Sequence, residues 1–138
     1  MGEAATYPGY THFLVTSPFP YIIHVELNRP QKLNAFNDET FSELRDVFDR
    51  IHRDSEVRAV VLSGKGEKAF TSGLDLEEAK RMAGGEGSAG EDPYRKSRKI
   101  KDAMKRWQEA CSAVEKCAKR ELLKQSLCLV FIANRPLL

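Results

Sequence analysis

The chain has little cysteine, no long apolar run and no strong excess of either charge. Its three cysteines, Cys111, Cys117 and Cys128, follow no zinc or redox spacing, so we expect free thiols in a reducing compartment. No apolar run approaches the ~18 residues that a membrane span requires. With a formal net charge of +2, the chain as a whole gives no reason to expect nucleic acid or an anionic membrane as a partner.

Motifs for phosphate loops and for targeting are missing as well. The segment GKGEK (64–68) lacks the GxxxxGKS or GxxxxGKT spacing of a phosphate-binding loop, and no GxGxxG follows the apolar segment before it. The N-terminus has neither a basic flank nor a long apolar core, so no signal peptide is evident, and the C-terminal RPLL is not a peroxisomal SKL-type signal. Gly2 and Thr6 fit a myristoylation pattern only formally, because basic residues that would help anchoring are missing.

What the chain does contain is an ordered series of strand and helix patterns. Residues 11–16 and 21–27 read as two strands, separated by SPFP (17–20), whose two prolines indicate a turn. Apolar and polar residues alternate in the second strand, which predicts a half-buried strand with His24 on its solvent side. These two segments predict an N-terminal β-hairpin.

A helix and a second kind of strand follow. Asn37 can cap a helix, and Phe36 can pack onto Phe41 across that helix start. An apolar face recurs at steps of three and four residues, at Phe41, Leu44, Phe48 and Ile51. Residues 57–62 are short, apolar and rich in β-branched side chains, which is typical of a parallel strand buried on both faces. Strand, helix and strand at this spacing predict a right-handed βαβ crossover.

The segment AFTSGLDL (69–76) forms a corner after that buried strand. Gly73 allows a sharp turn or a close approach to a ligand, and Asp75 can cap a short helix over LEEAKRMA (76–83). The amide of Leu74 then lies at or just before a helix start, where amides are unpaired and suit a developing negative charge on oxygen. From these residues alone, the corner fits either a structural turn or a place that holds a ligand.

A glycine-rich linker, GGEGSAGEDP (84–93), separates this corner from a long helix over residues 94–119. Its expected apolar face consists of Ile100, Met104, Trp107, Cys111 and Val114. Residues 94–124 hold eleven Lys or Arg against four Asp or Glu, a local charge of +7. We interpret the charge as a solvated outer face, and association with nucleic acid or a phosphorylated ligand is the alternative.

The ordered pieces LNRP, KLNAF, an amphipathic helix, VRAVVLSG and FTSGLDL closely resemble the N-terminal half of the enoyl-CoA hydratase/isomerase (crotonase) family. The resemblance covers about residues 13–117, and FTSGLDL with the long helix after it looks most like the Δ3,5-Δ2,4-dienoyl-CoA isomerase branch. It implies an α/β fold, an incomplete crotonase-like ββα spiral with an N-terminal β-hairpin, a βαβ unit and a long C-terminal helix. The implied activity is double-bond isomerisation or hydration of fatty acyl-CoA in β-oxidation.

In that family, two backbone amides hold the thioester oxygen while an enolate forms, and the residue that matches the first is Leu74. The resemblance further implies that two segments line the acyl-CoA: Lys32, Leu33 and Ala35 from the first, and Ser72, Gly73, Leu74, Asp75 and Leu76 from the second. Lys32 would meet a CoA phosphate as a point charge. No metal and no cofactor is implied other than the coenzyme A that the substrate carries, and neither nucleic acid nor a membrane is an expected partner. A family-type homo-oligomer and a mitochondrial or peroxisomal location are implied, with the cytoplasm open because no targeting signal is evident.

The resemblance stops after VEKC (114–117). The family continues with a PKPVIAA-like strand, a glycine-rich turn that supplies the second amide, and later the acidic residues that move protons. Here the sequence reads AKRELLKQSLCLVFIANRPLL (118–138), with no glycine after Gly90. Asp75, Glu77 and Glu78 have no evident reason for the raised pKa that a substitute base would need.

We therefore expect one partial domain over 1–138, made of a β/α core (10–92), a basic amphipathic helix (93–119) and a divergent tail (120–138). We also expect a truncated chain that is inactive or nearly so alone. A non-catalytic acyl-CoA-binding or interaction module derived from the family is the alternative. Residues 127–134 (LCLVFIAN) are either a strand that joins the sheet or the remainder of a frameshift or retained intron.

Overall fold

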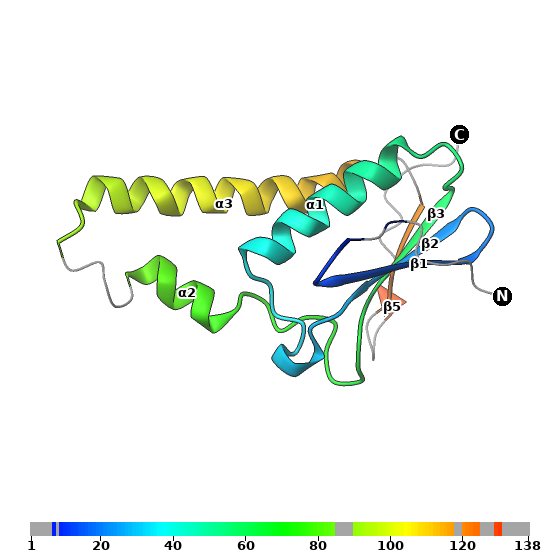
Figure 1. Ribbon diagram of the computed structural model, residues 1–138, viewed down its shortest axis with the longest axis horizontal. Helices are drawn as coiled ribbons and strands as arrows, with labels where there is room; N and C mark the ends of the chain where they lie inside the picture. The colour runs from blue at the N-terminus through cyan, green and yellow to red at the C-terminus, as the bar shows by residue number, and fades with distance from the viewer. Residues whose placement is uncertain (1–6, 8, 85–89, 118–119, 125–128, 131–138) are drawn as a thin grey trace.

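The computed structural model describes residues 7, 9–84, 90–117, 120–124 and 129–130. The sheet has the strand order β1 (Phe13–Phe19), β2 (Ile22–Leu27), β3 (Ala59–Gly64), β4 (Arg120–Lys124) and β5 (Leu129–Val130). Helices α1 (Asp38–Arg53) and α3 (Pro93–Lys116) lie side by side, and much of α3 extends beyond the sheet (Figure 1). This is the α/β class expected from the sequence. Within the described residues, no helix is both long and apolar enough to cross a membrane.

The N-terminal hairpin consists of β1 (Phe13–Phe19) and β2 (Ile22–Leu27), which pair antiparallel. The expected turn at residues 17–20 is wrong, because β1 continues through Pro18 to Phe19 and the chain reverses at Pro20 and Tyr21. The strand register shifts between Thr16 and Phe19, and such an irregularity is where a strand tolerates proline. Tyr21 adopts a positive φ of 67°, which completes the tight turn.

The βαβ unit is confirmed. Helix α1 (Asp38–Arg53) begins at the predicted cap, where the Asn37 side chain accepts a hydrogen bond from the Thr40 amide, and the rings of Phe36 and Phe41 lie 4.9 Å apart. Strand β3 (Ala59–Gly64) then runs parallel to β2 and starts two residues later than predicted.

The two faces of β3 differ, so the expectation of complete burial on both faces is only partly met. Val60 and Leu62 are buried against the helices, whereas Val61 on the opposite face is half-buried. His24 lies on that same opposite face, and its Nε2 lies 2.7 Å from the Ser63 hydroxyl. His24 is therefore half-buried and partnered, not a purely solvent-side residue, because the neighbouring parallel strand brings Ser63 beside it.

The hydrophobic core lies between the sheet and α1 and is closed at one end by the C-terminal part of α3. Residues that point inward from both hairpin strands meet the predicted apolar face of α1. The buried cluster includes Phe13, Val15, Ile23, Val25, Leu27, Leu44, Val47, Phe48, Ile51, Val57, Val60, Leu62, Ala110 and Cys117. This core fixes β2, β3 and α1 relative to one another, and hence the loops that follow both strands.

Helix α3 (Pro93–Lys116) is present, but the face that packs against α1 is rotated about the helix axis from the predicted one. Of the predicted face, Met104 and Cys111 are exposed, whereas Ile100, Trp107 and Val114 are half-buried. The buried positions are Ala103 and Ala110. Trp107 belongs to both the predicted and the observed contact face, and its ring stacks on that of Phe41 in α1, with 5.1 Å between the ring centroids. The prediction followed apolar side chains at steps of three and four residues, but the distance between two packed helices depends on the side chains at the contact, and small residues allow the closest approach.

Strand β4 (Arg120–Lys124) pairs parallel with β3, and β5 (Leu129–Val130) pairs antiparallel with β4. The strand that pairs with β3 is thus 120–124. Of the segment 127–134, which one sequence alternative placed in the sheet, the described residues Leu129 and Val130 form a strand. The rest of that segment, the linker centre at 85–89 and Cys128 lie outside the described residues.

Candidate functional site

Two loops meet at one edge of the sheet. The first (29–36) follows β2 and contains a short 3-10 helix, η1 (Pro30–Lys32); the second is the corner 69–76, which follows β3. Because β2 and β3 are parallel, both loops leave the sheet at the carboxyl ends of their strands. The two loops are joined by a parallel β-bridge between Phe36 and Leu74. The predicted site residues of the two segments are therefore brought together.

The hydrogen bonds of this bridge leave the Leu74 amide free. The Phe36 N–H donates to the Gly73 carbonyl, and the Phe36 carbonyl accepts from the Asp75 N–H, both at 2.8 Å. The Ser72 N–H donates to the Leu33 carbonyl at 3.0 Å. In a parallel bridge, the residues on either side of Leu74 make the bonds, so the Leu74 N–H points away from Phe36. Among the described residues no hydrogen bond uses the Leu74 amide, and Leu74 is 38% exposed.

The turn conformations at this edge are specific. Gly73 has φ 95°, and a Cβ added there would meet no atom within 4 Å, so its role is conformational freedom and not space. Leu33 and Asn34 also adopt positive φ values of 51° and 56°. Asparagine tolerates that region, but leucine does so only with strain, and the surrounding contacts must hold it there.

Asn34 supplies those contacts from the centre of the first loop. Its side chain is buried, accepts from the Arg29 amide at 3.0 Å and donates to the carbonyls of Lys65 and Ala69 at 3.0 and 3.1 Å. The Thr71 hydroxyl donates to the Asn34 carbonyl at 2.7 Å. One buried amide thus satisfies backbone groups of both loops.

A buried ion pair makes the second link between the loops. Arg29 Nη2 lies 3.1 Å from Asp75 Oδ2, with side chains 11% and 7% exposed, and Arg29 Nη1 donates to the Ala35 carbonyl. The other Asp75 oxygen accepts from the Glu77 amide at 3.0 Å and caps α2 (Leu76–Ala83), as predicted. That backbone hydrogen bond, with Arg29 beside it, holds the pKa of Asp75 below its usual value despite burial.

The remaining predicted residues fall into two groups. Lys32, Leu33, Ser72 and Leu76 are exposed at the edge, where a ligand can reach them. Lys32 Nζ lies 3.3 Å from Glu77 Oε1 across the two loops. Ala35, by contrast, is buried, so its side chain offers a ligand little surface.

The acidic residues near the corner are already engaged. Asp75 pairs with Arg29, Glu77 with Lys32, and the buried Glu78 with Arg81 of the same helix. Within the described residues, no group of three or more His, Cys, Asp or Glu side chains is arranged to hold a metal ion.

Sequence reasoning missed Arg29, Asn34 and Thr71, which organise the site without lining it. The available signal for Arg29 and Asn34 was the pair of motifs LNRP and KLNAF, each of which places strongly polar residues beside apolar ones in a turn. Such residues are usually exposed, and only the contact between two loops distant in sequence explains their burial here.

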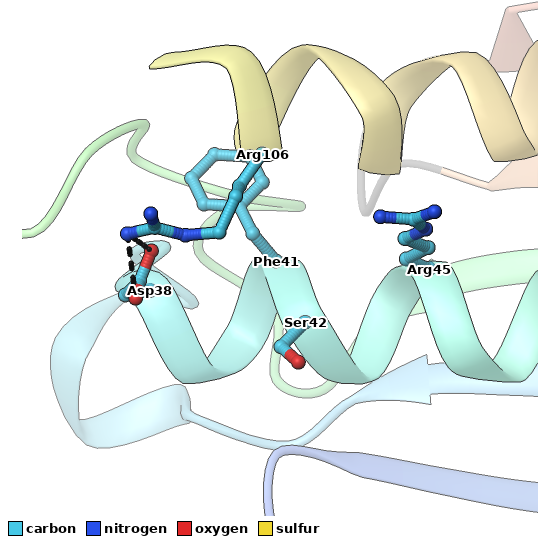
Figure 2. Close-up of a pocket in the computed structure, with 5 residues that line it drawn as sticks. All are labelled: Asp38, Phe41, Ser42, Arg45 and Arg106. Atoms are coloured by element: carbon cyan, nitrogen blue, oxygen red, sulfur yellow. Dashed lines mark hydrogen bonds and ion pairs between the residues drawn. The ribbon is translucent and has the colours of Figure 1, made fainter. Parts of the chain in front are cut away.

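A separate hollow lies between α1 and α3, lined by Asp38, Phe41, Ser42, Arg45 and Arg106. Figure 2 shows Arg106 reaching across Phe41 to Asp38, with both carboxylate oxygens 3.2 Å from Arg106 Nη2. Arg45 pairs with Glu109 at 2.6 Å. Both cations are therefore partnered, and the glycine corner is the better candidate for a ligand site.

Comparison with known proteins agrees with this geometry. A model of the enoyl-CoA hydratase/isomerase family matches residues 20–114. A mitochondrial Δ3,5-Δ2,4-dienoyl-CoA isomerase of Pongo abelii is 41% identical over 120 residues, which are 86% of this chain and 35% of that protein. A short-chain-enoyl-CoA hydratase of Clostridium acetobutylicum is 50% identical over 58 residues, 42% of this chain and 22% of that protein.

Solved structures show the same fold. An enoyl-CoA hydratase from Bacillus anthracis superposes with a TM-score of 0.67 at 23% identity, over 84% of this chain and 40% of that one. An enoyl-CoA hydratase/isomerase from Mycobacterium paratuberculosis does so with a TM-score of 0.67 at 24% identity, over 87% and 43%.

The sheet and the βαβ unit are those of a crotonase-fold protein. The chain belongs to the enoyl-CoA hydratase/isomerase family and resembles its dienoyl-CoA isomerase branch. It spans a little over a third of the length of the dienoyl-CoA isomerases that it matches over most of its own length.

Proposed function

We propose that the protein acts on fatty acyl-CoA thioesters and that the Leu74 amide donates a hydrogen bond to the thioester oxygen. The observation that carries this proposal is the backbone bridge, which fixes Leu74 in place and leaves its N–H without a partner among the described residues. An amide held in this way stabilises negative charge that develops on the oxygen as an enolate forms, and it needs no rearrangement to do so. The double-bond isomerisation or hydration of β-oxidation passes through such a charge.

The rest of the edge suits the coenzyme A portion. Lys32 and Leu33 on one loop and the backbone from Ser72 to Leu76 on the other offer exposed surface on both sides of the Leu74 amide. Lys32 and Glu77 form an exposed ion pair, which contributes little stability, so a phosphate can take the place of Glu77. We propose no metal and no cofactor beyond the coenzyme A of the substrate.

We further propose that this chain alone turns over acyl-CoA slowly or not at all. A base must reach the substrate with a pKa near the working pH. The three acids nearest the corner are each held by a cation, and Asp75 is kept ionised by a lowered pKa. This engagement favours the second candidate function, a non-catalytic acyl-CoA-binding module derived from the family. Conversion of a dienoyl- or enoyl-CoA well above background would exclude it.

Calorimetric titration of the chain with an acyl-CoA tests the binding site. We expect weak binding by the wild type and none by Leu74→Pro, which deletes the donor N–H. Leu74→Ala keeps that N–H and is the matched control, expected to retain binding. Equal affinity of the wild type and the proline variant, with circular dichroism showing both folded, would refute the oxyanion role.

We propose a mitochondrial or peroxisomal location and a family-type homo-oligomer. The location is supported by relatives named as mitochondrial and peroxisomal dienoyl-CoA isomerases. Cell fractionation followed by detection of the chain checks the location, and size-exclusion chromatography with light scattering checks the assembly.

A further inference from the structure

Arg29 is the point at which the two loops of the site are tied together. Its guanidinium contacts the carbonyl of Ala35 and a carboxylate oxygen of Asp75. Those two residues directly flank the bridged pair, since Ala35 precedes Phe36 and Asp75 follows Leu74. One planar side chain therefore holds both sides of the bridge that orients the Leu74 amide.

Stability alone does not account for this arrangement. Removing two charges from water is unfavourable, and a buried ion pair can often be replaced by apolar residues of similar volume without loss of stability. The cap of α2 does not need Arg29 either, because Asp75 accepts from the Glu77 amide with Oδ1 and contacts Arg29 with Oδ2. The two carboxylate oxygens of Asp75 thus have different partners. The contact between Oδ2 and Arg29 is explained instead by the position that it gives to the backbone of the two loops.

We infer that Arg29 is a positioning residue for the oxyanion amide, acting through Asp75 and Ala35. This inference rests on the proposed function, since it concerns the direction in which the Leu74 N–H meets the thioester oxygen. The planar fork of arginine reaches a carbonyl and a carboxylate at once, whereas lysine is a single point charge that does not span both. Arg29→Lys keeps the charge and loses the double contact.

The experiment uses the wild-type chain, two variants and one control with an acyl-CoA labelled with carbon-13 at the thioester carbonyl. The chemical shift of that carbon at saturation reports polarisation of the carbonyl, independently of affinity. Asp75→Asn keeps an acceptor for the α2 cap but loses the ion pair. Asp92→Asn is the matched control, because Asp92 is exposed and caps α3 through the Tyr94 amide in the same way, far from the corner.

We expect the bound carbonyl of the wild type and of Asp92→Asn to shift downfield from its free position. Arg29→Lys and Asp75→Asn should remain folded and lose most of that shift. A full shift in both folded variants would overturn the inference and leave the proposed function intact. Loss of folding in both would also overturn it, because the pair would then be required for the fold itself. No shift in the wild type would instead refute the proposed function, and the inference with it.

Discussion

Asn34 shows how one buried polar side chain can determine the shape of a site. Its amide group donates to two carbonyls and its oxygen accepts from one N–H, while its backbone adopts a left-handed conformation that asparagine tolerates. Gly64 lies against the same group, because a Cβ there would come within 2.8 Å of Asn34 Nδ2 and 2.4 Å of the Phe70 carbonyl. The shape of the first loop therefore depends on residues that hold its backbone in place.

Asn34→Asp tests this at the residue scale. Aspartate has nearly the same shape but places a second acceptor against the carbonyls of Lys65 and Ala69, in a buried position. We expect a loss of about 1–3 kcal/mol in the free energy of unfolding, as for a buried group left without its partners. Urea denaturation followed by circular dichroism measures it. An unchanged midpoint would contradict the role given to Asn34.

The start of α2 makes a prediction at the scale of elements. The pKa of Asp75 is lowered in the fold, chiefly by the Glu77 amide and further by Arg29. These contacts stabilise the ionised form in the fold, so their contribution to stability is fully present above the unfolded pKa of about 3.9 and is lost as the pH falls from there through the lower folded pKa. At neutral pH we expect Asp75→Asn to be less stable than the wild type by about 1.5–3 kcal/mol, as for a hydrogen bond to a charged group.

This difference should shrink as the pH falls below about 4, because the carboxylate of the unfolded wild type takes up a proton first and the folded carboxylate does so only at still lower pH. Urea unfolding of both proteins across that range, with Asp92→Asn as the exposed-cap control, provides the comparison. A difference that stays constant with pH would show that the Asp75 charge does not contribute.

The contact between α1 and α3 makes a second prediction for elements. Ala110 is fully buried where the helices meet, whereas Met104 is 50% exposed. Ala110→Leu adds volume to a packed contact and should cost about 1–3 kcal/mol. Met104→Lys, on the face that the sequence predicted to be buried, should change stability by no more than about 0.5 kcal/mol. Thermal unfolding of both variants shows which face of α3 packs against α1. A larger loss of stability from Met104→Lys than from Ala110→Leu would support the face predicted from the sequence.

At the scale of the whole molecule, the sequence predicted the parts governed by local patterns. The hairpin, the Asn37 cap, the βαβ unit and the short helix after Asp75 all follow from periodicity and capping, and the structure confirms them. The turn near Pro18 was wrong because a strand irregularity places that proline inside β1.

The arrangement of the candidate site could not be predicted in the same way. The Arg29–Asp75 pair joins residues 46 apart, and the Phe36–Leu74 bridge depends on the packing of β2 beside β3. No local pattern encodes such contacts. The resemblance to the family indicated which loops matter, but it did not indicate that Asn34 and Arg29 hold them together.

The proposed activity requires one N–H group above all, that of Leu74. The most direct measurement replaces the amide at this position with an ester, by incorporating the α-hydroxy analogue of leucine, which removes the N–H and keeps the side chain. The bound thioester carbonyl, labelled with carbon-13, is then compared with that of the wild type at saturating acyl-CoA. We predict a downfield shift in the wild type that is lost in the folded ester variant. The same downfield shift in both proteins would contradict the assignment of Leu74 as the oxyanion donor.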